Sequence, residues 1–150
     1  MTRRKHVAME PKILVPVNDS ETARATIESI IALKNRFPKT ITLLYVINKD
    51  QLAYRMIPEF QLEMVRENAQ KAGKALLNKY SSKLVEEGFK PEIILELGTP
   101  QAVIANIANR DGFNLLVIGR HEGGGEIRDV LFGSVANYVL HNVKCPVLLF

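Results

Sequence analysis

Short apolar runs alternate with longer amphipathic runs along the whole chain. The apolar runs have the length of strands and read KILVPV (12–17), TITLLYVI (40–47), KPEIILELG (90–98), NLLVIG (114–119) and PVLLF (146–150). Apolar runs of this kind are typical of parallel strands that are covered on both faces of their sheet. The pattern therefore predicts an α/β protein with a five-stranded, mainly parallel sheet and helices on both faces.

The first amphipathic run predicts a helix over residues 20–36, with isoleucines at i, i+3 and i+4 spacing. Either Asp19 or Ser20 is expected to cap its first turn. A second, longer helix fits residues 59–87, and Gly88 is well placed to end it. The side chains expected along its buried stripe are Phe60, Met64, Ala72, Leu76, Tyr80 and Leu84.

A third helix is predicted to end near Arg110, with Thr99 as its cap and Pro100 in its first position. Its expected buried residues are Val103, Ile104, Ile107 and Ala108. A last helix is predicted to begin near Ser134, before the fifth strand.

Composition indicates a globular chain, with 47% hydrophobic and 24% charged residues. No apolar run approaches the roughly 20 residues that span a bilayer, and the first residues lack the apolar stretch of a secretory signal. We expect one cytoplasmic domain over residues 1–150, with residues 1–10 as a flexible basic tail.

The net charge of +4 is concentrated at the start of the chain, where Arg3, Arg4, Lys5 and Lys12 against Glu10 account for +3. The rest of the chain is close to neutral and carries no basic motif with aromatic residues, so we expect no nucleic-acid partner. The single cysteine and three scattered histidines give no metal-ligand spacing, and we expect no metal site in the protein itself.

Ligands of open parallel sheets bind beyond the carboxyl ends of the strands. The loops at those ends lack the G-x-G-x-x-G fingerprint and the phosphate-binding P-loop. A phosphoacceptor domain is excluded as well, because Gly98, Thr99 and Pro100 stand where a carboxylate is needed after the third strand.

The glycines after the fourth strand are the best candidate for a ligand site. Gly119 ends that strand, Gly123 to Gly125 allow close approach of main chain, and Gly133-Ser134 opens a helix. Free amide groups and the dipole at a helix start favour an anion. The alternative interpretation is an ordinary strand-helix loop with a capping serine.

The chain resembles the universal stress protein family. The resemblance rests on KILVPVNDSETA at the start, LGTPQAVIANIA in the middle, and VIGRHEGGG…LFGSVANYVL…CPVLL at the end, and it covers residues 11 to 150. Nucleotide-binding members are similar in carrying G-x2-G-x9-G-[S/T] after the fourth strand. The resemblance implies a Rossmann-like fold of the adenine nucleotide alpha hydrolase type with strand order 3-2-1-4-5.

The resemblance also implies an adenine nucleotide, usually ATP, with or without Mg²⁺. The base is expected near Pro16, Val17, Asn18 and Val46, at the ends of the first two strands. The ribose and phosphates are expected at the end of the fourth strand and the start of the last helix, against Gly119, Arg120, His121, Gly123, Gly133, Ser134 and Val135. Ile118, at the end of the fourth strand, is also expected to contact the nucleotide. Family members form homodimers, and here the fifth strand is expected to pair, through Val147, Leu148, Leu149 and Phe150.

Two departures from the family pattern support a second hypothesis. The first glycine gap is one residue longer, with Glu122 in place of a glycine, and Asn18 stands where an acid is common. A dimeric interaction module that has lost nucleotide binding is therefore an alternative. No set of residues specifies catalysis, so the leading hypothesis is a nucleotide-binding stress or regulatory protein without efficient catalysis, and a weak ATP hydrolase ranks last.

Overall fold

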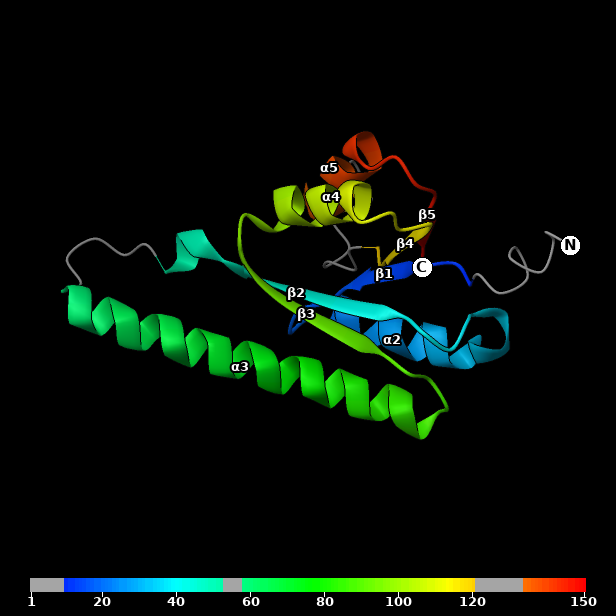
Figure 1. The fold of residues 1–150 in the computed structure, drawn as a ribbon, viewed down its shortest axis with the longest axis horizontal. Helices are drawn as coiled ribbons and strands as arrows, with labels where there is room; N and C mark the ends of the chain where they lie inside the picture. Colours follow the sequence, from blue (N-terminus) through cyan, green and yellow to red (C-terminus); the bar gives the residue numbers. More distant parts are fainter. Residues whose placement is uncertain (1–9, 53–57, 121–133) are drawn as a thin grey trace, which may run out of the picture.

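The computed structural model describes residues 10–52, 58–120 and 134–150. Their strands form one five-stranded sheet in the order β3-β2-β1-β4-β5, and every neighbouring pair is parallel (Figure 1). The strands are β1 (Ile13–Pro16), β2 (Thr42–Asn48), β3 (Glu92–Gly98), β4 (Leu115–Ile118) and β5 (Val147–Leu149). The predicted fold class and strand order are confirmed.

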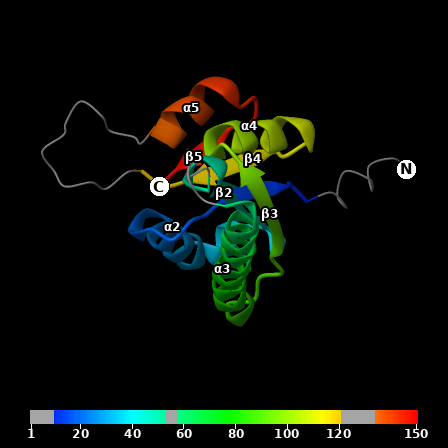
Figure 2. The same ribbon diagram turned by 90° about the vertical axis from the view of Figure 1, so that its left-hand side faces the viewer.

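Two helices cover each face of the sheet. The helices of the described ranges are α2 (Glu21–Ala32), α3 (Glu59–Glu86), α4 (Pro100–Arg110) and α5 (Ser134–Asn142), with short 3-10 turns at η1 (Lys34–Arg36) and η2 (Lys49–Gln51). Figure 2 shows α2 and α3 on one side of the sheet and α4 and α5 on the other. The first predicted helix is thus α2 followed by η1.

The central strands bury side chains toward both helical layers. Val15 of β1 and Val117 of β4 face α2 and α3, while Leu14 and Leu116 of the same strands face α4 and α5. All four are fully buried. Each such side chain contributes roughly 1.5–3 kcal/mol of transfer free energy, so burial on both faces strongly stabilises these two central strands.

The structure distinguishes between the candidate caps at the helix starts. Ser20 caps α2, because its Oγ accepts a hydrogen bond from the Ala23 N–H at 3.1 Å. Asp19 forms an ion pair with Arg24 instead. Thr99 is the N-cap of α4 and Pro100 its first residue, as predicted, although the Thr99 side chain makes no cap bond. The Val103 N–H donates to the Thr99 main-chain oxygen at 2.9 Å, and this bond closes the first turn.

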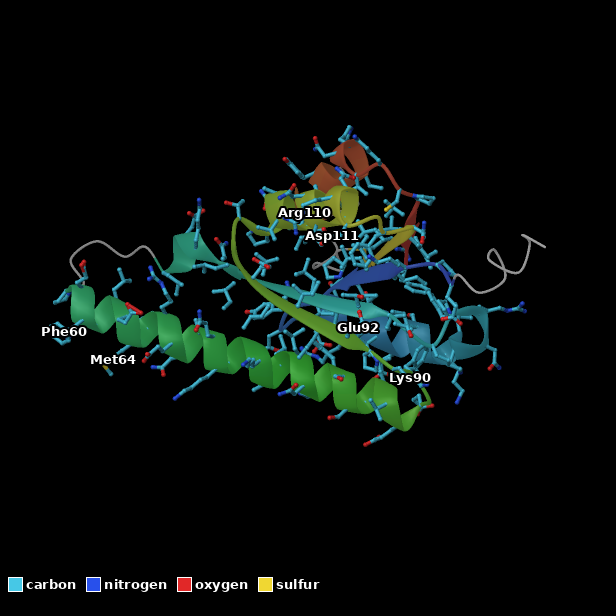
Figure 3. The ribbon with its side chains drawn as sticks, in the orientation of Figure 1. Phe60, Met64, Lys90, Glu92, Arg110 and Asp111 are labelled. Atoms are coloured by element: carbon cyan, nitrogen blue, oxygen red, sulfur yellow. The ribbon has the colours of Figure 1, made fainter. Side chains whose placement is uncertain are left out.

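The buried stripe of α3 matches the predicted one only in part, because Tyr80 and Leu84 are buried, Leu76 is half-buried and Ala72 is exposed. Gly73, Leu77, Tyr80 and Leu84 are its buried residues. Phe60 and Met64 are 68% and 58% exposed, and Figure 3 shows both pointing away from the sheet. The first turns of α3 project beyond the ends of β2 and β3 (Figure 1), so no strand is available there to cover.

Gly73 marks the point where α3 comes close to the sheet. A Cβ atom at this position would lie 2.8 Å from Leu95 Cδ1 and 2.9 Å from Tyr45 Cδ2. The absence of a side chain therefore lets the helix approach β2 and β3 closely.

The edge strand β3 is covered less completely than its sequence predicts. Ile93 and Leu97 are 40% and 41% exposed although both belong to an apolar run. The edge position explains this, because β3 has a neighbouring strand on one side only.

The buried residues of α4 agree largely with the predicted ones. Ile104, Ile107 and Ala108 are buried as expected, together with Ala105, whereas Val103 is half-buried.

Within the described ranges, no helix combines the length and the apolar character that crossing a membrane requires. The basic segment 1–10 lies outside these ranges except for Glu10, which is exposed.

Candidate functional site

The order in which strands are added to the sheet reverses between β1 and β4. From β1 the chain adds β2 and β3 on one side, and it then adds β4 and β5 on the other. β1 pairs with β2 on one side and with β4 on the other, with Leu14 opposite both Thr42 and Leu116. The connection that leaves β1 leads through α2 to β2, whereas the one that leaves β4 leads toward α5 and β5. The two connections therefore diverge at the carboxyl ends of neighbouring strands, which is the position where open α/β sheets bind ligands.

The turn after β1 is held through both oxygen atoms of Asn18. Its main-chain oxygen accepts a hydrogen bond from the Tyr80 hydroxyl at 3.1 Å, and its Oδ1 accepts one from the Ser20 hydroxyl at 2.5 Å. Just before it, the Val17 N–H donates to the Leu44 oxygen at 2.8 Å and extends the pairing of β1 with β2. The side chain of Asn18 is exposed at the edge of the sheet.

Tyr80 reaches this turn from the middle of α3. Its side chain is 3% exposed, and burial raises the pKa of its phenol above the usual value. The hydroxyl is therefore protonated near neutral pH and available as a donor. Helical periodicity predicts Tyr80 as a core residue, but no local pattern reveals a hydrogen-bond partner 62 positions away.

Gly119 lies against the first two turns of α2. A Cβ at this position would overlap Thr26 Oγ1 and would lie 2.7 Å from Thr22 Cγ2. Thr26 is 1% exposed, and its hydroxyl donates to the Thr22 main-chain oxygen at 2.8 Å, so it has little freedom to move. The close packing of β4 against α2 thus accounts for glycine at this position, and sequence reasoning had missed both threonines.

Phe150 is hydrogen-bonded to the last residue of β4 and to Arg120, two residues beyond that strand. The Phe150 N–H donates to the Ile118 oxygen at 3.0 Å, and the Arg120 N–H donates to the Phe150 oxygen at 2.9 Å. The Arg120 side chain is exposed at this edge. Strand pairing therefore continues to Arg120, which carries a guanidinium at the carboxyl edge.

The predicted apolar site residues divide between the two faces of the sheet. Val46 and Ile118 belong to the core cluster beneath α4 and α5, and Val135 packs against the same cluster. Val17 lies in the opposite cluster, beneath α2 and α3. Pro16, at the end of β1, is half-buried. The structure thus brings Val46, Ile118 and Val135 to one face and directs the Val17 side chain to the other.

α5 begins at Ser134, close to where the last helix is predicted to start. Since α5 leads into β5, which runs parallel to β4, its amino terminus lies at the carboxyl edge of the sheet. The first amides of such a helix are not bonded within the helix and attract anions. His121, Gly123 and Gly133, together with the Ser134 side chain, lie outside the described residues.

In the parts of the chain that the structure describes, no group of three or more His, Cys, Asp or Glu residues is placed to hold a metal ion. Asp19, the acidic residue nearest the end of β1, is paired with Arg24 at 3.0 Å.

Comparison with known proteins places the chain in a family. The family model described as the universal stress protein family matches residues 9–150. Universal stress protein MJ0577 of Methanocaldococcus jannaschii is 30% identical over 94% of each chain. A solved structure of MJ0577 superimposes with a TM-score of 0.78 at 27% identity, covering 95% of this chain and 96% of that one. The chain therefore belongs to the universal stress protein family.

Two more distant solved structures share the fold. One is a universal stress protein family protein from Arabidopsis thaliana with AMP bound, with a TM-score of 0.67 and 21% identity over 93% of this chain and 90% of that one. The other is a universal stress protein in complex with cAMP, with a TM-score of 0.64 and 19% identity over 95% and 98%.

The contact of Gly119 with α2 makes a prediction about stability. We expect Gly119→Ala to lower the free energy of unfolding by about 1–3 kcal/mol, because the new methyl group overlaps the hydroxyl of buried Thr26 and the methyl group of half-buried Thr22. Urea denaturation measures the difference. In a background that carries Thr22→Ser and Thr26→Ala, both overlapping side-chain atoms are removed and only the Thr22 main-chain oxygen, 3.2 Å from the new Cβ, stays close, so the same substitution is expected to cost clearly less. Equal costs in the two backgrounds would contradict this explanation.

Proposed function

We propose that this protein is an adenine-nucleotide-binding stress-response or regulatory protein that acts as a homodimer without efficient catalysis. The nucleotide, ATP with or without Mg²⁺, binds at the carboxyl edge of the sheet between β1 and β4. The observation that carries the proposal is the position of the α5 amino terminus at the edge where the connections from β1 and β4 diverge.

The α5 amino terminus and the end of β4 suit the phosphates. Helix amides and the helix dipole favour negative charge, and the exposed Arg120 guanidinium adds a cation at the same edge. In this proposal the ribose and phosphates contact Gly119, Arg120, His121, Gly123, Gly133, Ser134 and Val135. The bound nucleotide would supply the charge that these groups neutralise.

The base is proposed to lie near the ends of β1 and β2. Pro16, Val17 and Asn18 contribute mainly their main chain, and Val46 and Ile118 provide apolar surface on one face of the sheet. The family members solved with AMP and with cAMP support an adenine nucleotide as the ligand. Relatives of the same fold therefore point to the same class of ligand as the geometry of this edge.

A second candidate function is a dimeric interaction module of the same fold without nucleotide binding. Glu122 and Asn18 favour it, because the first adds negative charge near the proposed phosphates and the second replaces an acid common in the family. The packing of Gly119 against α2 also favours it, since this glycine would be required without any ligand.

Slow ATP hydrolysis is the third and weakest candidate. A dedicated phosphotransferase needs a positioned base and acids that hold the metal. Asp19, the acid closest in sequence to the end of β1, is paired with Arg24.

We further propose that residues 1–150 form a single domain in the cytoplasm, with residues 1–10 as its basic tail.

The proposed dimer forms through β5. This strand lies at the edge of the sheet, and Val147, Leu148 and Leu149 are only half-buried. The outer main-chain groups and apolar side chains of an edge strand favour pairing with another strand. A second copy of β5 would cover both the main chain and these side chains.

Calorimetric titration with ATP tests nucleotide binding. We expect the wild type to bind, Ser134→Ala to bind about tenfold more weakly through loss of a hydrogen bond to a charged group, and Gly133→Asp not to bind because of charge repulsion. Asn137→Asp is the matched control, since it adds the same charge to an exposed position one turn further along α5. Titrations with and without Mg²⁺ show whether the metal ion contributes to ATP binding.

Absence of binding by the wild type at millimolar ATP would favour the interaction module instead. Release of phosphate that disappears in His121→Ala would favour the hydrolase.

Sedimentation equilibrium tests the dimer. The wild type is expected at twice the chain mass of 16.8 kDa, and Val147→Lys is expected as a monomer because the charge interrupts the apolar edge. Ile93→Lys, on the opposite edge strand β3, is the control and should remain dimeric. A monomeric wild type, or a dimeric Val147→Lys, would refute pairing through β5.

A further inference from the structure

One hydrogen bond connects the middle of α3 to the turn at the proposed site. The Tyr80 hydroxyl donates to the main-chain oxygen of Asn18 at 3.1 Å. Asn18 is the first residue after Val17, whose N–H bonds to β2, so it stands where the regular pairing of β1 ends. Tyr80 therefore holds the turn at the position where the main chain leaves the sheet.

The other polar contacts of this turn are local. Asn18 Oδ1 is bonded to Ser20, Ser20 Oγ accepts from the Ala23 N–H, and Asp19 pairs with Arg24. These contacts shape the turn and the start of α2, but they do not place either relative to another element. Among the hydrogen bonds of the described residues, the one from Tyr80 is the side-chain bond that joins residues 18–20 to α3.

Burial makes this bond strong and directional. The Tyr80 ring is packed in the cluster that also contains Val17 and Leu77, and the side chain is 3% exposed. A buried hydroxyl without a partner is costly. Because the ring is held by its packing, the Asn18 oxygen must stay within hydrogen-bonding distance of the hydroxyl. The turn is thereby fixed relative to the rigid core.

We propose that Tyr80 is a positioning residue of the nucleotide site: its hydroxyl fixes the turn after β1 in the conformation that receives the nucleotide. This inference rests on the proposed function. Tyr80 itself touches no ligand, because it lies within the core and acts through Asn18. Its contribution is to remove freedom from the turn before binding, so that less conformational entropy is lost when the ligand binds.

The test compares Tyr80→Phe with Leu84→Val by ATP calorimetry on the full chain. Tyr80→Phe keeps the ring and removes only the hydroxyl. Leu84→Val removes a methylene from a fully buried side chain one helical turn away and does not touch the turn after β1. Both variants are first checked for cooperative unfolding and used well below their melting temperatures. Tyr80→Phe is expected to weaken ATP binding about fivefold, the loss of roughly one hydrogen bond, and Leu84→Val to bind as the wild type does.

Amide hydrogen exchange without nucleotide provides a readout that general destabilisation would not reproduce. In Tyr80→Phe, exchange at residues 18–23 is expected to rise more than exchange in the rest of the protein. In Leu84→Val, exchange at these residues is expected to change only as much as the loss of global stability requires. If the wild type binds ATP and Tyr80→Phe binds equally well, the positioning role is refuted and the proposed function stands. If the wild type binds no nucleotide, both are refuted.

Discussion

The parallel pairing of β1 with β4 is the constraint on which the rest of the site depends. Both strands are short, and their central residues Leu14, Val15, Leu116 and Val117 are fully buried between the two helical layers. Because the pairing register is determined by this double burial, the carboxyl ends of the two strands emerge side by side. Their connections then diverge, which is the arrangement in which open α/β sheets bind ligands.

Two contacts hold this edge from the same side of the sheet. Gly119 packs directly against Thr22 and Thr26 of α2, and the turn at Asn18 is bonded to Tyr80 of α3. The opposite side is different, because α5 begins there and directs its first amides toward the edge. One side of the edge is thus held by packing and a buried hydrogen bond, and the other offers a positive helix end. Such an arrangement suits an anionic ligand that binds against preformed main chain.

Much of the fold could be predicted from hydrophobic patterning. The five apolar runs became the five strands, while their order came from the family resemblance, since periodicity alone does not order strands. The stripe on α3 failed at Phe60 and Met64 because the helix extends past the sheet, and a periodic pattern does not show where a neighbouring strand ends. The uneven cover of β3 reflects its edge position in the same way.

For the candidate site, chain order predicts which residues lie at the carboxyl edge of the sheet, but it does not predict their side-chain contacts. Strand ends placed Val46, Ile118, Gly119 and Arg120 at the carboxyl edge. Alternation along β1 indicates that the Val17 side chain turns away from the face of Val46, a consequence that sequence reasoning had overlooked. The partners of Gly119 and the hydroxyl bond of Tyr80 join residues far apart in the sequence, and no local pattern encodes them.

The central claim is that an adenine nucleotide binds at the edge between β1 and β4, and mapping by NMR tests it most directly. In an ¹⁵N-labelled sample titrated with ATP, the largest amide shift changes are expected at residues 17–20, 119–120 and 134–136. The amides of Lys39, Lys90 and Phe113, at the amino ends of the strands, are expected to stay unchanged. Changes concentrated at that opposite edge, or none at millimolar ATP, would contradict the account.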